Sequence, residues 1–150
     1  MEEDYVNFET AKLLKEKGFN EVCRAFWKEW DGQIMLCHCS SGHVFEWCHN
    51  SMLENYNDEE ETNIAAPTHQ MAMKWLREMH NIHIGDNITY TEDPEKFPPK
   101  YYVYVSDTKT GDTLIKKECC LARKNLTPKS FDSPEEACEA AIKYCLENLI

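Results

Sequence analysis

Five cysteine and histidine side chains in a short central stretch have the chemistry of zinc ligands. They are Cys37, Cys39, His43, Cys48 and His49. Zinc in proteins takes four thiolate or imidazole ligands in a tetrahedron, often from closely spaced pairs. The spacing here, Cys-x-Cys-x3-His-x4-Cys-His, differs from those standard motifs. The stretch therefore has two interpretations: a small zinc-binding module built on the Cys37/Cys39 hairpin, or structural thiols in a strand core.

The strands that carry these residues limit how many ligands can meet. Side chains alternate between the two faces of a strand, and we expect Cys39 and His43 to flank a short turn. With a three-residue turn, Cys37 and Cys39 face His43, but Cys48 points to the opposite face. With a two-residue turn, Cys37, Cys39 and Cys48 lie on one face of the sheet, and His43 lies on the other. Neither register gathers four ligands without a bulge or help from Cys23, so we predict structural thiols and assign no metal ligand.

Two further groups of histidines and cysteines lack the spacing of a known site. The histidines are His69, His80 and His83, and the cysteines are Cys119, Cys120, Cys138 and Cys145. A metal site would need a carboxylate or a thiol beside the histidines, and a redox pair would show Cys-x-x-Cys at the start of a helix. We therefore predict histidines on a wet surface and buried structural thiols.

Motifs that signal catalysis are also missing. The chain has no Gly-x-Ser-x-Gly and no His-Glu-x-x-His, and its five glycines form no phosphate-binding loop. We therefore name no catalytic residue, no cofactor and no cofactor-binding residue. An enzyme without a recognisable motif stays open as an alternative.

The charge balance argues against nucleic-acid binding. The chain has 27 acidic and 16 basic residues, which gives a net charge of -11 at pH 7. Affinity for phosphate backbones comes largely from clustered lysine and arginine side chains. The candidates for a local basic patch are Lys116, Lys117, Arg123, Lys124 and Lys129. The charge instead favours an acidic surface that engages a basic protein partner.

Composition also bears on location. No run of about 18 apolar residues is present, so we expect no membrane-spanning segment. The acidic start, residues 1–4, is unlike the basic start of a signal peptide. We therefore expect a cytoplasmic protein, in which the eight cysteines are thiols or metal ligands and not disulfides.

Capping and turn signals define the elements of the first half. Asn7 can cap a helix over residues 8–17, and Gly18 can end it. Asp31–Gly32 is a strong signal for a two-residue hairpin turn. The strands expected in this half cover residues 19–30, 33–39 and 43–48. Residues 53–66 follow with five carboxylates, and we expect them to be a solvated, mobile linker.

The second half begins with a helix at Pro67–Thr68. Its apolar residues Ala72, Trp75, Leu76 and Met79 fall at the spacing of a buried stripe. The strands expected next cover residues 82–84, 101–106 and 112–120, with an irregular segment over residues 85–99.

The last helix has the clearest start signal. Ser133 and Glu136 form a capping box, Pro134 occupies the first helical position, and Phe131 can pack over the start. Its expected apolar face is made of Ala137, Ala141, Tyr144, Cys145 and Leu149.

These elements predict an α+β fold. Three helices pack on one antiparallel sheet, or on two, in the order α-β-β-β-α-β-β-β-α. Residues 1–150 form one domain of ordinary size. That domain has two possible subunits, residues 7–50 and 67–150, which the acidic linker of residues 53–66 would join.

Three segments resemble small uncharacterised proteins encoded by phages and prophages of gut Bacteroidales. They are residues 5–19, which read Tyr-Val-Asn-Phe-Glu-Thr-Ala, then Lys-Leu-Leu-Lys-Glu-Lys-Gly-Phe; residues 67–84; and residues 131–150, with the spacing Glu-Glu-Ala-x-x-Ala-Ala. No activity is established for that group, so the resemblance implies an origin and a fold but no reaction. The central cysteine and histidine stretch does not match the group.

We therefore expect a non-enzymatic accessory protein of a phage or prophage in the cytoplasm of its bacterial host. It would bind a host or phage protein through its acidic surface. The zinc-binding module and the enzyme without a motif are the alternatives. An uncovered strand edge could in addition support a homodimer.

Overall fold

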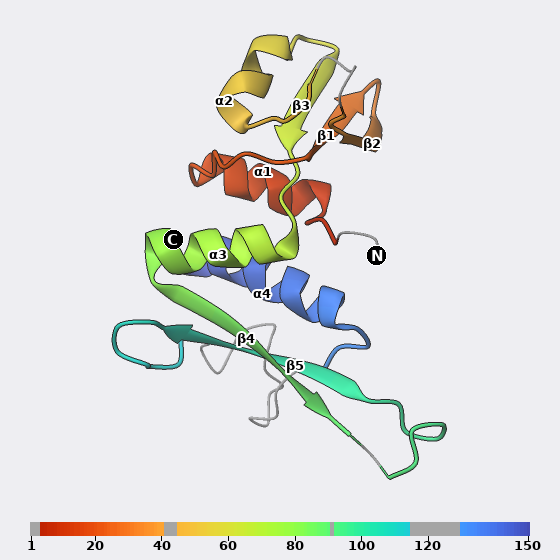
Figure 1. Cartoon of the computed structure of the whole chain (residues 1–150), viewed down its shortest axis with the longest axis vertical. Coiled ribbons are helices and arrows are strands. Elements are labelled where there is room, and N and C mark those ends of the chain that lie inside the picture. The colour runs from red at the N-terminus through yellow and green to blue at the C-terminus, as the bar shows by residue number, and fades with distance from the viewer. Residues whose placement is uncertain (1–3, 41–44, 91, 115–129) are drawn as a thin grey trace. The chain divides into compact units, whose positions relative to one another are not determined.

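A computed structural model describes residues 4–40, 45–90, 92–114 and 130–150. Among these residues the fold is α+β, with four α-helices and two small antiparallel sheets (Figure 1). In chain order the elements are α1 (Phe8–Glu16), β1 (Ala25–Trp30), β2 (Gln33–His38), α2 (Asn50–Leu53), the 3-10 helix η1 (Glu54–Tyr56), β3 (Glu61–Ala65), α3 (His69–His80), β4 (Ile82–Thr89), β5 (Lys100–Asp107) and α4 (Pro134–Asn148). The α+β class is confirmed, whereas the predicted order of three helices and six strands differs from the one observed.

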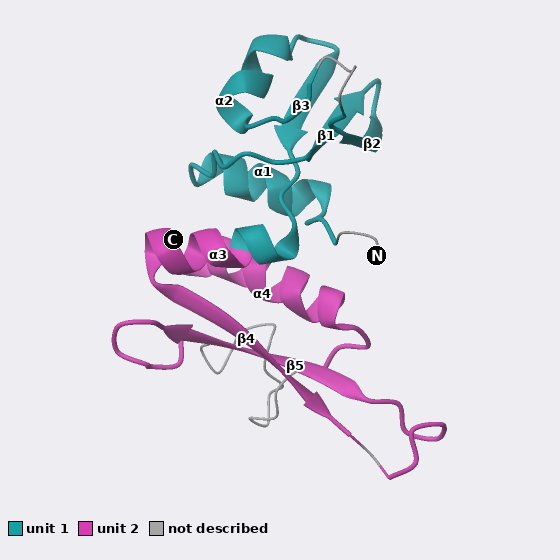
Figure 2. Ribbon diagram, in the orientation of Figure 1, with its two compact units in different colours: residues 1–72 teal, residues 73–150 magenta. Residues whose placement is uncertain are grey.

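The chain divides into two compact units, residues 1–72 and residues 73–150 (Figure 2). The division falls inside α3, between Ala72 and Met73. None of the described helices combines the length and the apolarity that crossing a membrane requires.

Unit 1 opens with the predicted capped helix. The Asn7 side chain accepts a hydrogen bond from the Thr10 N–H at 2.9 Å, and Gly18 takes a positive φ of 91° just past the end of the helix. Phe8 and Leu14 are buried on the face of α1 that packs with the sheet. The Trp27 indole of β1 reaches the same face, because it donates to the Val6 carbonyl and contacts the Phe8 ring.

The sheet of unit 1 has the strand order β2-β1-β3, with both pairs antiparallel. Asp31 and Gly32 both have positive φ, 50° and 70°, as a two-residue turn between antiparallel strands requires. The predicted hairpin is therefore confirmed. The first strand is shorter than predicted, because only Ala25–Trp30 pairs and residues 19–24 are irregular apart from a single bridge at Cys23.

Two other predictions for unit 1 are wrong. The described part of the strand predicted over 43–48 forms no strand, and residues 43 and 44 lie outside the described residues. Residues 53–66 are not a linker: they contain the buried Leu53, η1 and all of β3. The strand forms there because it pairs with β1, and Asn50 holds it from outside the sheet. Asn50 Oδ1 accepts the Ala65 N–H at 3.0 Å, and Asn50 Nδ2 donates to the Phe19 carbonyl at 2.8 Å.

Unit 2 is built on the β4–β5 hairpin. Its two strands pair antiparallel along their full length, from Ile82 opposite Asp107 to Thr89 opposite Lys100. Helix α4 packs against both strands. The Ser133 side chain caps α4 by accepting the Glu136 N–H at 3.1 Å, which is one half of the predicted capping box, and the Glu136 side chain accepts the Asp132 N–H at 3.3 Å. The buried residues of α4 are Ala137, Ala141, Ile142, Tyr144, Cys145 and Leu146.

Three predictions for the second half need correction. Ala72, Trp75 and Leu76 are buried, but Met79 is 64 % exposed because it lies in the last turn of α3. β4 extends to Thr89, so the segment predicted to be irregular starts five residues later than expected. Of the return strand predicted over 112–120, the described residues 112–114 form a single bridge at Thr113, and residues 115–129 lie outside the described residues.

Candidate functional site

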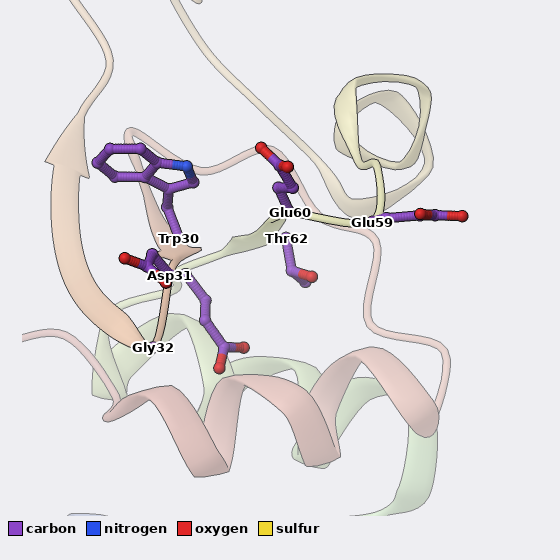
Figure 3. A pocket seen from close by; sticks show the side chains of 7 residues that line it. Trp30, Asp31, Gly32, Glu59, Glu60 and Thr62 are labelled. Carbon is purple, nitrogen blue, oxygen red and sulfur yellow. The ribbon is translucent and has the colours of Figure 1, made fainter.

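An acidic hollow lies at the turn end of the unit 1 sheet and encloses about 640 Å³. Its lining consists of Glu29, Trp30, Asp31, Gly32, Glu59, Glu60 and Thr62. In Figure 3 the labelled residues of the β1–β2 turn lie on one side of the hollow, and Glu59 and Glu60 lie on the other. We refer to these residues as the acidic hollow.

Strand register explains why acidic residues that are distant in the sequence line the same hollow. Trp30 of β1 pairs with Glu61 of β3, and Glu29 pairs with Thr62. Continuing that register places the turn residue Asp31 beside Glu60. The acidic ends of two segments, which lie about 30 residues apart in the sequence, therefore become neighbours.

The backbone before β3 is held by Asp58. Its Oδ1 accepts hydrogen bonds from the N–H groups of Glu60 and Glu61, both at 2.8 Å. The Asp58 N–H donates to the Glu61 carbonyl at 2.9 Å. This local turn fixes the direction of the chain at Glu59 and Glu60, so the two carboxylates are carried on an ordered support.

No lysine or arginine belongs to the described lining of the hollow. The nearest cation on the sheet, Lys28, is paired with Glu61 at 2.8 Å. Hydrogen bonds from Lys28 and from Asn63 lower the pKa of the Glu61 carboxyl. Lys28 is therefore engaged with Glu61, which does not belong to the lining of the hollow.

This arrangement can bind a cationic group. Four carboxylates attract a guanidinium or an ammonium ion, and a planar guanidinium can be held by two oxygens at once. Trp30 is 49 % exposed at the rim and offers an indole face, to which such cations are attracted. The chemistry is that of recognising an arginine or lysine side chain of a partner.

The structure places the predicted cysteine and histidine ligands differently from either hairpin register. Cys48 forms a bridge with Cys23, not with β2, through N–H to carbonyl bonds of 2.7 and 3.0 Å. The Cys48 thiol donates to the Ala25 carbonyl at 3.3 Å and to the Cys23 carbonyl at 3.7 Å, and burial raises the pKa of Cys48. Cys37 instead lines a second, more apolar hollow with Phe26.

Cys23, Cys39 and Cys48 thus lie close to one another, and Cys37 faces elsewhere. Among the residues described, no three histidine, cysteine or acidic side chains are placed to share a metal ion. His43 lies outside the described residues. His49 has a structural role, since its Nδ1 accepts the Met52 N–H at the start of α2.

The described members of the other two groups lie in different surroundings. The His80 ring contacts Trp75, and the His83 ring contacts Tyr104. His69 is buried. Cys138 is partly exposed and Cys145 is buried on α4, whereas Cys119 and Cys120 lie outside the described residues.

Burial makes a prediction for cysteine chemistry. It raises the pKa values of Cys23 and Cys145 to about 12, so their thiolate forms are rare at pH 8. In the folded protein we expect iodoacetamide to alkylate the partly exposed Cys37 at least about a hundredfold faster than Cys145. Peptide mass spectrometry over a time course measures both rates, and the protein in denaturant, where the two should react alike, is the control. Equal rates in the folded protein would refute the burial assigned to Cys145.

Comparison with known proteins finds no match, whether with a protein-family model, a curated protein or a solved structure.

Proposed function

We propose that this protein is a non-enzymatic accessory protein of a phage or prophage that acts by binding a basic host or phage protein. Its place of action would be the cytoplasm of the bacterial host. The phage origin is supported by the resemblance of residues 5–19, 67–84 and 131–150. The binding role is supported by the acidic hollow.

The hollow is the observation that carries the proposal. Its carboxylates come from β1, from the β1–β2 turn and from the turn that Asp58 holds before β3, and its described lining contains no cation that would neutralise them. Such a site selects partners by charge and speeds their association. Its binding to them weakens as salt screens the attraction. The zinc-module alternative has no comparable support, because no described group of side chains would hold the ion.

A charge-reversal pair tests the location of binding. In the double variant Glu59→Lys/Glu60→Lys we expect the dissociation constant for an oligo-arginine peptide to rise by about tenfold or more at low salt. The matched control is Glu92→Lys/Glu95→Lys, which alters two exposed glutamates of unit 2. Both variants change the net charge from -11 to -7, since each replacement adds two charges.

Fluorescence anisotropy of the labelled peptide gives the three dissociation constants. The proposal requires the control to bind like the unchanged protein and binding to weaken as salt rises. If both variants lose the same affinity, binding follows net charge and not the hollow, and the proposed site is wrong. Binding that is indifferent to salt would reject the charge mechanism itself.

A further inference from the structure

The outer edge of β2 has no described partner. β2 pairs only with β1, and the register runs from Trp30 opposite Gln33 at the turn to Ala25 opposite His38. In a two-residue hairpin the pair next to the turn exchanges hydrogen bonds, and such pairs then alternate along the ladder. The backbone groups of Ile34, Leu36 and His38 therefore point away from β1. Within the part of the chain that the structure describes, no hydrogen bond reaches these groups.

The opposite edge of the same sheet, which β3 forms, is closed. The outer N–H groups of β3 are taken up by side chains: Asn57 Oδ1 accepts from Asn63 at 2.6 Å, and Asn50 Oδ1 accepts from Ala65 at 3.0 Å. Asp58 closes the start of the strand at Glu61. One edge of this three-stranded sheet is thus capped by its own chain and the other is left open.

The open edge also lacks the usual protection against pairing. Natural edge strands carry charges, proline or a bulge that discourage the approach of another strand. β2 reads Gln-Ile-Met-Leu-Cys-His, with no acidic or basic group apart from its terminal histidine and no proline. Ile34 is 47 % exposed and Met35 is 43 % exposed, and the two side chains lie on opposite faces of the strand.

We propose that β2 pairs with β2 of a second copy of this chain, antiparallel across a two-fold axis at Leu36, so that the two sheets become continuous. Leu36 then lies opposite the partner's Leu36, and Ile34 lies opposite the partner's His38. These are the residues whose backbone groups point outward, so every one of them gains a hydrogen-bonded partner. On the other face, Met35 lies beside the partner's Cys37 and buries apolar surface.

The lack of charge on β2 favours a second copy of this chain, and not the basic partner of the acidic hollow, as the protein that pairs with this edge. An uncharged strand offers a basic protein nothing to bind, but it fits another uncharged strand. Antiparallel pairing also sends the two acidic hollows to opposite ends of the shared sheet, because each lies at the turn end of its own hairpin. Two chains of net charge -11 can therefore meet along the stretch where their repulsion is weakest.

Sedimentation velocity over a concentration series reaching about 0.1 mM tests the dimer. The unchanged protein should reach twice the mass of one chain. Ile34→Glu/Met35→Glu should raise the dimer dissociation constant by at least about tenfold, because charges on an edge strand discourage the approach of another strand and these carboxylates would lose solvent on pairing. The control Val22→Glu/Met79→Glu adds the same charge at two exposed apolar sites away from β2 and should still dimerise. Circular dichroism shows whether each variant is folded.

A crosslink tests the register and does not depend on a loss of binding. Met35→Cys should form an interchain disulfide with the partner's Cys37 under mild oxidation, since facing residues at such non-hydrogen-bonded positions are about 4.5 Å apart at Cα. Adding Cys37→Ser should abolish the crosslink, and Ile34→Cys, on the other face, should not form it. A monomer at every concentration overturns the proposal. So does a dimer that β2 substitutions leave intact, or a Met35→Cys protein whose dimer does not crosslink through Cys37.

Discussion

Replacing Trp75 with alanine is expected to lower the free energy of unfolding by about 3 to 5 kcal/mol. Trp75 is 6 % exposed in α3, where Ala72 and Leu76 complete the buried stripe. The centroid of its ring lies 4.6 Å from the centroid of the His80 ring, and the two rings meet edge-on. Truncation to alanine removes the indole from a packed environment and leaves a cavity that the helix can fill only in part. The protein therefore loses the transfer free energy of the indole and in addition bears the free-energy cost of the cavity.

Urea denaturation followed by circular dichroism measures this loss. The control comes from the same helix: Met79→Ala removes an exposed side chain and should change the free energy of unfolding by no more than about 0.5 kcal/mol. The two positions belong to one predicted stripe but differ in burial. The pair therefore tests whether burial, and not a place in the stripe, determines the loss of stability. A Trp75→Ala protein that loses less than about 1 kcal/mol would contradict the burial described for this side chain.

Replacing Asn50 with alanine is expected to cost about 2 to 4 kcal/mol, although the side chain is small and polar. Asn50 is buried and joins two distant segments, the Phe19 carbonyl and the Ala65 N–H. Without the amide, both backbone groups lose their partner in a buried place, and each carries a desolvation cost.

Asn55→Ala provides the matched control, because Asn55 is exposed and its Nδ2 only donates to the Ser51 carbonyl at 3.4 Å. Urea denaturation of both variants gives the difference, and amide hydrogen exchange at Ala65 reports the local effect. We expect Ala65 to lose protection in Asn50→Ala only. If the two variants are equally stable, β3 does not depend on Asn50.

Local signals predicted most of the local structure. The Asn7 and Ser133 caps, the Asp31–Gly32 turn and the strand over residues 101–106 each depend on residues within one turn or one strand. In such cases a single side chain or a positive φ decides the conformation, and the sequence displays both. Helices α1, α3 and α4 and the β1–β2 hairpin could therefore be located before any tertiary contact was known, whereas α2 and the β4–β5 pairing were missed.

The segment around β3 could not be predicted in the same way. Its carboxylates suggested a solvated linker, because composition is the only local signal there. The strand is instead stabilised by partners outside the segment or before the strand: the edge of β1, Asn50 and Asn57. Tertiary contacts of this kind override local preference and leave little trace in the sequence.

The candidate site escaped prediction for the same reason. The acidic hollow exists only because β3 pairs with β1 and brings Glu59 and Glu60 to the turn at Asp31. A signal was present in residues 62–65, Thr-Asn-Ile-Ala, which are compatible with a short strand after the acidic run. The cysteine and histidine stretch drew attention instead because its residue types are those of metal ligands.

The central claim is that a basic partner binds at the acidic hollow, and nuclear magnetic resonance tests it most directly. An oligo-arginine peptide is titrated into the isotope-labelled protein, and the Trp30 indole N–H signal is followed. The claim predicts shifts at that indole and at the amides of Asp31, Glu59 and Glu60, all reduced by added salt and absent in Glu59→Lys/Glu60→Lys. Shifts confined to other acidic segments, or no shift at the Trp30 indole while the peptide binds, would contradict it.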